Sequence, residues 1–269
     1  MDFPGVAFIT GAASGIGRAT SLLFAAEGCQ RIVISDINEA GLEETKALIA
    51  ESHGGAGAGA GPDVLAVPVD LRSESSVDSL VEKAVARFGR LDYCCNVAGI
   101  VLGGGTAEVQ TSDFELQYEV NLRGVFFCER AELRVLRQQE PLASKDSKYP
   151  IRGAIVNVSS LAGQMAYADL PAYSAFKHGV CGLSKSDAMK YGPEGIRINT
   201  VCPGAVTTPI TKNLPPQKPE ELEALLKIIA LGRYADPEEL AQAIVWLSSG
   251  RASYINGTTL SVNGGRQGF

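Results

Sequence analysis

Short apolar runs recur along the chain, separated by longer segments in which apolar positions repeat every three to four residues. Runs of this length are typical of strands buried on both faces, and the longer segments are typical of helices with one apolar side. Strands are predicted at 6–9, 31–35, 64–69, 91–95, 154–158, 196–202 and 258–262. Helices are predicted at 18–27, 38–51, 73–88, 112–139, 171–190 and 238–249. This alternation indicates an α/β fold, a doubly wound parallel sheet of about seven strands with helices on both faces.

Three segments interrupt the alternation. Residues 54–61 contain only Gly and Ala and are predicted to form a surface insertion, because a phosphate-binding loop would need a strand before it and a helix after it. Residues 140–149 are polar, with Pro141 near the start and Pro150 directly after the end, which predicts a loop before the fifth strand. Residues 209–233 form a long, proline-rich segment of mixed polarity, and long loops of this kind often cover substrates.

Size and charge narrow the classes of function. With 269 residues, of which 45% are hydrophobic, the chain can bury one large core, so 1–269 is expected to be a single domain with a substrate loop at about 205–234. The net charge is −6, and Lys and Arg are scattered, which disfavours nucleic acid as a partner. No apolar run approaches the length of a membrane span. The first residues carry an acid and lead directly into a strand, so no signal peptide is expected.

The six cysteines do not predict a metal site. The chain has no C-x-x-C pattern and only two histidines, so no metal is expected. Several of the cysteines lie in apolar runs, as reduced core thiols do in cytoplasmic proteins. We therefore expect a cytoplasmic location.

A glycine-rich turn joins the first strand to the first helix, with the sequence Thr10-Gly-Ala-Ala-Ser-Gly-Ile-Gly17. A strand, a glycine turn and a helix together place backbone N–H groups and a helix N-terminus against a diphosphate. Gly11 permits the turn, Gly15 lets the backbone approach the phosphates, and Gly17 lets the helix pack on the strand. The spacing is G-x-x-x-G-x-G rather than G-x-G-x-x-G, and an ordinary glycine-rich connection is the alternative for this motif alone.

Asp36 ends the second strand. An acid at this strand tip can accept hydrogen bonds from the adenosine ribose and would repel a 2′-phosphate. Neither Ser14 nor Ile37 supplies a cation that could hold such a phosphate. NAD is therefore favoured, and NADP is not excluded. The alternative is an acid that merely starts the following helix.

Tyr173 and Lys177 are four positions apart, just after a helix start at Asp169 and Pro171. At this spacing both side chains project from one helix face. A phenol has a pKa of about 10, and a nearby ammonium would lower it, so that the Tyr could exchange a proton with an alcohol or a ketone. The pair at 159–160 ends the fifth strand, so a hydroxyl there could hold the reacting oxygen. The alternative is a surface lysine beside a half-buried tyrosine.

In this order, the motifs resemble the short-chain dehydrogenase/reductase family, in its compact single-domain branch, and the likeness covers nearly the whole chain. The residues that carry it are Thr10-Gly-x-x-x-Gly-Ile-Gly17, Asn96-x-Ala-Gly99, Ser160 and Tyr173-x-x-x-Lys177. The thirteen-residue interval from Ser160 to Tyr173 is the family's usual one and selects Ser160 over Ser159. The chain departs from many relatives at Val97, where they have Asn, and at Phe176, where they have Ser.

The resemblance implies a Rossmann fold and a division of catalytic roles. Tyr173 would exchange the proton on the substrate oxygen, and Ser160 would position and polarise that oxygen. Lys177 would lower the pKa of the Tyr and bind the nicotinamide ribose. Asn121 would bend its helix and connect Lys177 to solvent through water. Arg130 stands where some relatives have a basic residue near the cofactor, with an ordinary solvated arginine as the alternative.

The resemblance also implies the cofactor contacts. Asp70 and Leu71 would touch adenine, and the Val206 backbone and Thr208 hydroxyl would hold the carboxamide. The complete set comprises Gly11, Ser14, Gly15, Ile16, Gly17, Asp36, Asp70, Leu71, Asn96, Ala98, Gly99, Tyr173, Lys177, Pro203, Gly204, Val206 and Thr208.

The expected function is an NAD(P)-dependent interconversion of a secondary alcohol and a ketone. Residues 103–105, 161–170 and 209–233 are the expected pocket walls, and their composition indicates a mainly apolar, possibly cyclic small molecule. Two alternatives remain: a dinucleotide-binding protein without catalysis, and an epimerase or dehydratase of the same family that recycles its cofactor. Small residues along 171–190, together with the resemblance, imply a homodimer or homotetramer.

Overall fold

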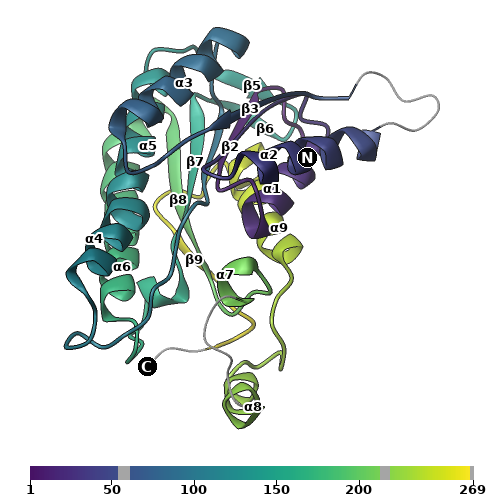
Figure 1. Cartoon of the computed structure of the whole chain (residues 1–269). Coiled ribbons are helices and arrows are strands. Elements are labelled where there is room, and N and C mark those ends of the chain that lie inside the picture. The colour runs from purple at the N-terminus through teal and green to yellow at the C-terminus, as the bar shows by residue number, and fades with distance from the viewer. Residues whose placement is uncertain (54–60, 213–218, 267–269) are drawn as a thin grey trace.

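The computed structural model describes residues 1–53, 61–212 and 219–266. Within these ranges seven strands form one parallel sheet in the order β3-β2-β1-β4-β7-β8-β9 (Figure 1). The strands are β1 Val6–Thr10, β2 Arg31–Asp36, β3 Asp63–Pro68, β4 Tyr93–Asn96, β7 Gly153–Val158, β8 Ile196–Pro203 and β9 Thr259–Val262. The expected doubly wound sheet is confirmed. All but the last residue of the predicted Gly/Ala insertion lies outside the described residues.

Helices cover both faces of the sheet (Figure 1). One face carries α1 (Gly15–Ala26), α2 (Glu39–His53) and α9 (Pro237–Ser248). The other carries α3 (Glu74–Phe88), α5 (Val125–Leu136) and α6 (Pro171–Tyr191). Strands buried between two helix layers need apolar side chains on both sides, which explains their continuous apolar runs.

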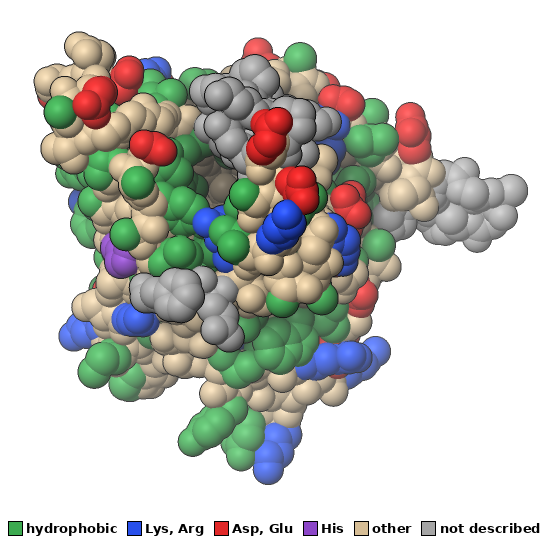
Figure 2. Space-filling model, turned by 90° about the horizontal axis from the view of Figure 1, so that it is seen from below, with side chains coloured by type: hydrophobic (Ala, Val, Ile, Leu, Met, Phe, Trp, Pro, Cys, Tyr) green, Lys and Arg blue, Asp and Glu red, His purple; other side chains and the backbone are tan. Residues whose placement is uncertain are grey.

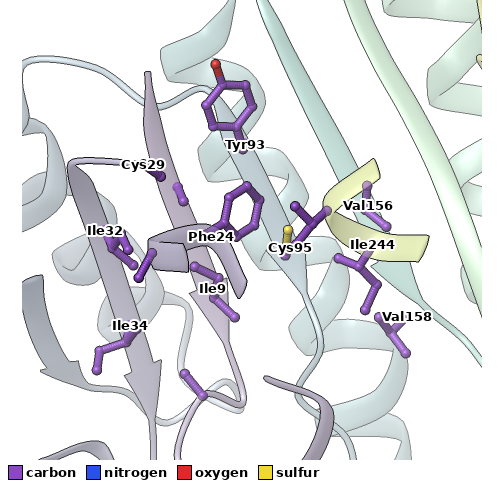
Figure 3. Packing of buried hydrophobic residues seen from close by; sticks show 14 of the residues in the cluster. Ile9, Phe24, Cys29, Ile32, Ile34, Tyr93, Cys95, Val156, Val158 and Ile244 are labelled. Carbon is purple, nitrogen blue, oxygen red and sulfur yellow. The ribbon is translucent and has the colours of Figure 1, made fainter. Parts of the chain in front are cut away.

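The core is split by the sheet into two apolar clusters. In the first, the rings of Phe24 and Tyr93 stack with their centroids 6.0 Å apart. Figure 3 shows this cluster, in which Phe24 of α1 and Ile244 of α9 lie among side chains of the sheet. This packing fixes α1, and therefore the glycine turn before it, relative to β1 and β4.

The strand order reverses between β1 and β4, and the loops that leave their carboxyl ends diverge there. Such a point is where doubly wound sheets bind ligands. Thr10 and Asn96 are paired at these ends, and the Val97 backbone N–H donates to the Thr10 hydroxyl at 3.1 Å. The glycine turn and the segment after Asn96 are thus held side by side.

The prediction of a loop over residues 140–149 was wrong. This segment forms an antiparallel hairpin of β5 (Leu142–Ser144) and β6 (Ser147–Ile151). The Asp2 carboxylate accepts hydrogen bonds from the Ser144 hydroxyl (3.0 Å) and the Lys145 backbone N–H (2.6 Å). The polar hairpin is therefore held by the distant N-terminus, a contact that local periodicity does not show.

Two further segments differ from their predicted form. The helix expected at 112–139 is divided into α4 (Thr111–Tyr118), a π-helical turn (Glu119–Gly124) and α5. The segment 209–233, predicted as a loop, contains α7 (Pro209–Lys212) and α8 (Pro219–Lys227). Both of these short helices begin at a proline, which suits the first helical position. None of the helices within the described residues is long and apolar enough to cross a membrane.

Candidate active site

The glycine turn is shaped by close backbone contacts. Gly11 and Gly15 have positive φ angles of +70° and +50°, which other residues rarely adopt. A Cβ atom on Gly17 would lie 2.1 Å from the carbonyl oxygen of Gly11, so α1 approaches the turn as closely as a backbone can. Ser14 caps α1 without using its side chain, which leaves N–H groups at the helix start available to an anion. The turn is therefore a cradle that fits a diphosphate.

A cleft of about 450 Å³ opens above this turn. It gathers many of the residues that the sequence predicts for the cofactor, namely Gly11, Ser14, Gly15, Ile16, Gly17, Asp36, Asp70, Leu71, Ala98, Gly99 and Thr208. The residues absent from its lining are Asn96, Tyr173, Lys177, Pro203, Gly204 and Val206. Sequence reasoning missed Leu116 and Val120, which line the cleft from α4 and the π turn. Their only signal was that of apolar positions in a helix.

The two predicted acids of the cleft have different partners. Asp36 accepts backbone N–H groups from Ala13 (3.1 Å) and Asn38 (3.0 Å), which fixes its carboxylate at the end of β2. Asp70 instead forms an ion pair with Arg72 at 2.7 Å, and this hydrogen-bonded guanidinium holds the pKa of Asp70 below its usual value. Among the described residues, Arg72 is the only Arg or Lys that lines the cleft. Arg130 pairs with Glu74 elsewhere, on the outside of the helix layer.

Tyr173 and Lys177 share one face of α6. The Lys177 Nζ lies 5.7 Å from the centre of the Tyr173 ring and donates a hydrogen bond to the Val158 carbonyl at 3.0 Å. Burial raises the pKa of Tyr173 to about 12, and the hydrogen bond with the Ser160 hydroxyl acts in the opposite direction. Burial also lowers the pKa of Lys177, which is 3% exposed, to about 8. Desolvation is the largest cause of the shift, so the pKa of Tyr173 is raised and not lowered as the sequence predicted.

The structure separates the roles of the two neighbouring serines. Ser159 is buried, and its hydroxyl donates to the backbone carbonyl of Lys177 at 2.8 Å. Ser160 starts the next turn, where its oxygen accepts the Ala162 N–H at 3.1 Å and its hydroxyl interacts with Tyr173. Ser159 therefore ties β7 to α6, while Ser160 lies at the phenol.

Asn121 lies in the π turn and is fully buried. Its amide makes two hydrogen bonds of 2.9 Å with the backbone of Ile100, one to the N–H and one to the carbonyl. A Cβ atom on Gly99 would lie 3.1 Å from the Asn121 Oδ1 and 3.3 Å from the Lys177 Nζ. Since Gly99 lines the cleft, these contacts connect Asn121 and Lys177 to its inner end.

A buried polar network lies beneath the site, and sequence reasoning missed its acids. The Asn96 side-chain amide donates to Glu132 (3.1 Å) and to Asn157 (3.0 Å), and the Asn157 amide donates to Glu129 (2.8 Å). The Asn96 side chain is therefore part of this buried network and does not line the cleft. Burial raises the pKa of both glutamates to about 8. Across the described residues, no group of three or more His, Cys, Asp or Glu side chains could hold a metal ion.

Comparisons with known proteins agree with this geometry. Residues 11–267 match a family model described as enoyl-(acyl carrier protein) reductase. The chain is 39% identical to a short-chain dehydrogenase of Neurospora crassa, over 98% of this chain and 97% of that protein. It is 38% identical to cis-4-hydroxycyclohexanecarboxylate dehydrogenase of Sinomonas cyclohexanicum, over 97% and 95%.

Two solved structures are similar over nearly the whole chain. Levodione reductase superposes with a TM-score of 0.87 at 33% identity, covering 98% of each chain. The 3-ketoacyl-(acyl-carrier-protein) reductase of Brucella melitensis, solved as a complex with NADH, gives a TM-score of 0.82 at 30% identity, also over 98% of each chain.

Proposed function

Because the chain belongs to the short-chain dehydrogenase/reductase family, we propose that this NAD(P)-dependent alcohol dehydrogenase or ketoreductase uses Tyr173 as the acid and base on the substrate oxygen. The observation that carries this proposal is the meeting of three groups. The Ser160 hydroxyl interacts with the Tyr173 phenol, and the Lys177 amine lies over the ring of Tyr173. Gly99 connects this group to the inner end of the dinucleotide cleft.

The chain's own residues divide the work. The bound nicotinamide supplies or accepts the hydride. Ser160 orients the substrate oxygen by a hydrogen bond, and Tyr173 gives a proton to that oxygen in reduction or takes one in oxidation. The neutral phenol of the buried Tyr173 is a proton donor at pH 7. Lys177 and Asn121, both buried, hold the inner wall of the site.

The proposed cofactor is NAD, with Asp36 as the selecting residue. Its carboxylate is fixed at the end of β2 in a cleft whose lining includes Arg72 as its one described cation, already paired with Asp70. An acid in this position accepts ribose hydroxyls and repels a 2′-phosphate. The predicted contacts outside the cleft lining, among them Pro203, Gly204 and the Val206 backbone, remain part of the proposal on the nicotinamide side.

The proposed substrate is a mainly apolar, cyclic secondary alcohol or the corresponding ketone. Two similar proteins, by their names, act on a hydroxycyclohexanecarboxylate and on levodione. We propose that 1–269 is one catalytic domain and that the segment 205–234, with α7 and α8, covers the substrate. The six free, buried cysteines support a reducing compartment such as the cytoplasm.

We also propose that the chain self-associates through the exposed side of α6. Gly182 lies on that side, and a Cβ atom placed on it would meet nothing within 4 Å. Phe126 of α5 is 41% exposed, which adds apolar surface to the same helix layer. Small residues let two helices approach closely, so a homodimer or homotetramer is expected.

The Tyr173→Phe variant tests the proposed function. Ketone reduction with NADH should fall by about 10³-fold or more, because the proton donor is removed, while NADH binding measured by fluorescence should stay nearly unchanged. Tyr254→Phe, at a fully exposed tyrosine, is the matched control and should retain activity. Unchanged turnover in Tyr173→Phe would defeat the assignment.

The same assay separates the two alternatives. Binding of NADH without turnover of any alcohol or ketone by the native chain would favour a non-catalytic dinucleotide-binding protein. Product formation without net change in NADH would favour an epimerase or dehydratase that recycles its cofactor.

A further inference from the structure

Among the described residues, Arg266 has no anionic partner, and it lies close to the C-terminal end of the described chain. Its guanidinium carbon lies 4.8 Å from the centre of the Tyr167 ring. Its Nε atom is buried and has no hydrogen-bond partner in the part of the chain that the structure describes. Ion pairs among the described residues involve other arginines, and none involves Arg266. A buried donor left without an acceptor is unfavourable, and an acceptor oxygen of a ligand would satisfy it.

The backbone around Arg266 is held in one place. The Asn263 side chain donates to the Arg266 carbonyl at 2.8 Å and accepts the Gly265 N–H at 3.0 Å. Gly264 has a φ of +66°, and its carbonyl accepts the Leu231 N–H at 3.0 Å. A Cβ atom on Gly204 would lie 2.8 Å from the Asn263 Cα. The C-terminal turn is thus fixed between the loop after β8 and the segment that follows α8.

This position faces the proposed substrate side of the site. Arg266 lines a hollow of about 420 Å³ together with residues of the segment after Ser160, among them Leu161, Gln164 and Met165. The Gln164 amide is already used, since it accepts from the Ser261 hydroxyl (2.7 Å) and donates to the Thr259 carbonyl (3.2 Å). Tyr167, beneath the guanidinium, is near enough to Tyr173 to influence its pKa.

The charge within the hollow is more specific than that of the surrounding surface. Figure 2 looks at the edge of the molecule that carries α7 and α8, where both basic and acidic side chains lie near the middle of the face. Within the described lining of the hollow, Arg266 is the only charged residue. From this described lining, a carboxylate that entered the hollow would meet one guanidinium and no acid.

We propose that Arg266 binds an anionic group of the substrate, so that the natural substrate is a hydroxy acid or oxo acid with its carboxylate remote from the reacting carbon. The proposal rests on the proposed alcohol–ketone chemistry and names its substrate class. A guanidinium presents a planar set of donors that matches a carboxylate, and it binds one more strongly than it binds a neutral acceptor. Stacking on Tyr167 holds the plane of the guanidinium in place.

The test uses two ketones that differ only in the substituent at C4, which is a carboxylate in 4-oxocyclohexanecarboxylate and an uncharged methyl group in 4-methylcyclohexanone. Each is reduced with NADH by the full-length protein. The native chain should prefer the acid in kcat/KM. In Arg266→Met the KM of the acid should rise by about 10- to 100-fold, as expected for the loss of a charge-assisted pair. The kcat/KM of the neutral ketone should change by less than about two-fold, and Arg266→Lys should recover part of the loss for the acid.

A structural role and a binding role give different results. If Arg266 only supported Tyr167, its removal would slow both ketones equally, and that outcome would overturn the proposal. An unchanged KM for the acid in Arg266→Met would overturn it as well. Equal melting temperatures of the native chain and Arg266→Met would show that the turn is intact.

A binding measurement keeps this proposal separate from the proposed function. Cyclohexanecarboxylate is titrated calorimetrically into the NADH-saturated protein. Binding by the native chain that is lost in Arg266→Met would support the anion site even if neither ketone were reduced. A third result is that the protein reduces 4-methylcyclohexanone but neither binds cyclohexanecarboxylate nor prefers the oxo acid. That result would support the enzyme assignment and contradict the role of Arg266.

Discussion

The Lys177 Nζ lies 5.7 Å from the centre of the Tyr173 ring, and it donates a hydrogen bond to the carbonyl of Val158. Burial moves the pKa values of the two groups apart, raising that of Tyr173 to about 12 and lowering that of Lys177 to about 8. Within the pH range in which proteins are usually assayed, the amine therefore titrates before the phenol.

The first prediction concerns the pH dependence of catalysis. Lys177 is protonated below about pH 8. Its positive charge makes the Tyr173 phenol a better proton donor to the ketone oxygen. The kcat/KM of ketone reduction should fall as the pH rises through about 8, and that of alcohol oxidation should rise over the same range. Profiles in both directions provide the measurement. In Lys177→Arg, which stays charged, the transition near pH 8 should vanish. A transition unchanged in this variant would contradict the assignment.

The second prediction concerns cofactor choice. Replacing Asp36 by Ser removes the acid that we propose binds the ribose, so the ratio of kcat/KM for NAD to that for NADP should fall by about 10- to 100-fold, which corresponds to about 1–3 kcal/mol. Steady-state kinetics with both cofactors measure this ratio. Glu43→Ser, at an exposed acid further along α2, is the control and should leave the ratio unchanged. A ratio that responds equally to both variants would show a general effect of charge.

The third prediction concerns stability. The pKa of buried Glu132 is raised from 4.5 to about 8, so the folded state holds a proton that the unfolded chain releases between these pH values. Its contribution to stability is complete below about pH 4.5 and is lost as the pH rises to about 8. Glu132→Gln keeps the shape but cannot ionise, so at pH 8 it should melt above the native chain, by about 2–4 °C for each kcal/mol regained.

Calorimetry at pH 5 and at pH 8 checks this prediction. At pH 5 the melting temperatures of Glu132→Gln and the native chain should differ little. Glu82→Gln, at an exposed position of α3, should show no such pH-dependent gain. The idea is falsified if the Glu132 variant is less stable than the native chain at pH 8.

The fourth prediction concerns association through α6. Gly182→Arg places a long charged side chain on the exposed side of this helix, where nothing in the same chain lies within 4 Å. The fold should survive, and the dimer or tetramer should dissociate to monomers in light scattering. Glu51→Arg, at an exposed acid of α2 on the opposite face of the sheet, is the control and should leave the mass unchanged. A native-sized assembly in Gly182→Arg would place the interface elsewhere.

Much of the fold could be predicted from the sequence because its signals are local. Apolar runs marked the strands of the central sheet, Ser73 and Gly89 marked the ends of α3, and Pro171 is the first residue of α6. The turn from Thr10 to Gly17 was recognisable because its glycines are needed for backbone geometry.

The remaining features depend on contacts between distant parts of the chain. The β5–β6 hairpin is held by Asp2. Glu132 accepts a hydrogen bond from Asn96 of β4, and Asn96 also donates to Asn157 of β7. The position of Arg266 depends on segments that pack against the C-terminal turn. In the sequence alone, each of these residues looks like an ordinary surface or helix position.

The bond between the Ser159 hydroxyl and the Lys177 carbonyl clamps the tip of β7 to α6 at a point below the reacting groups. Residues 161–170 form the connection between β7 and α6, and both of its ends are therefore held in place by this bond. The sequence of this connection could therefore be redesigned to change the substrate specificity, while Ser160, Tyr173 and Lys177 keep their positions.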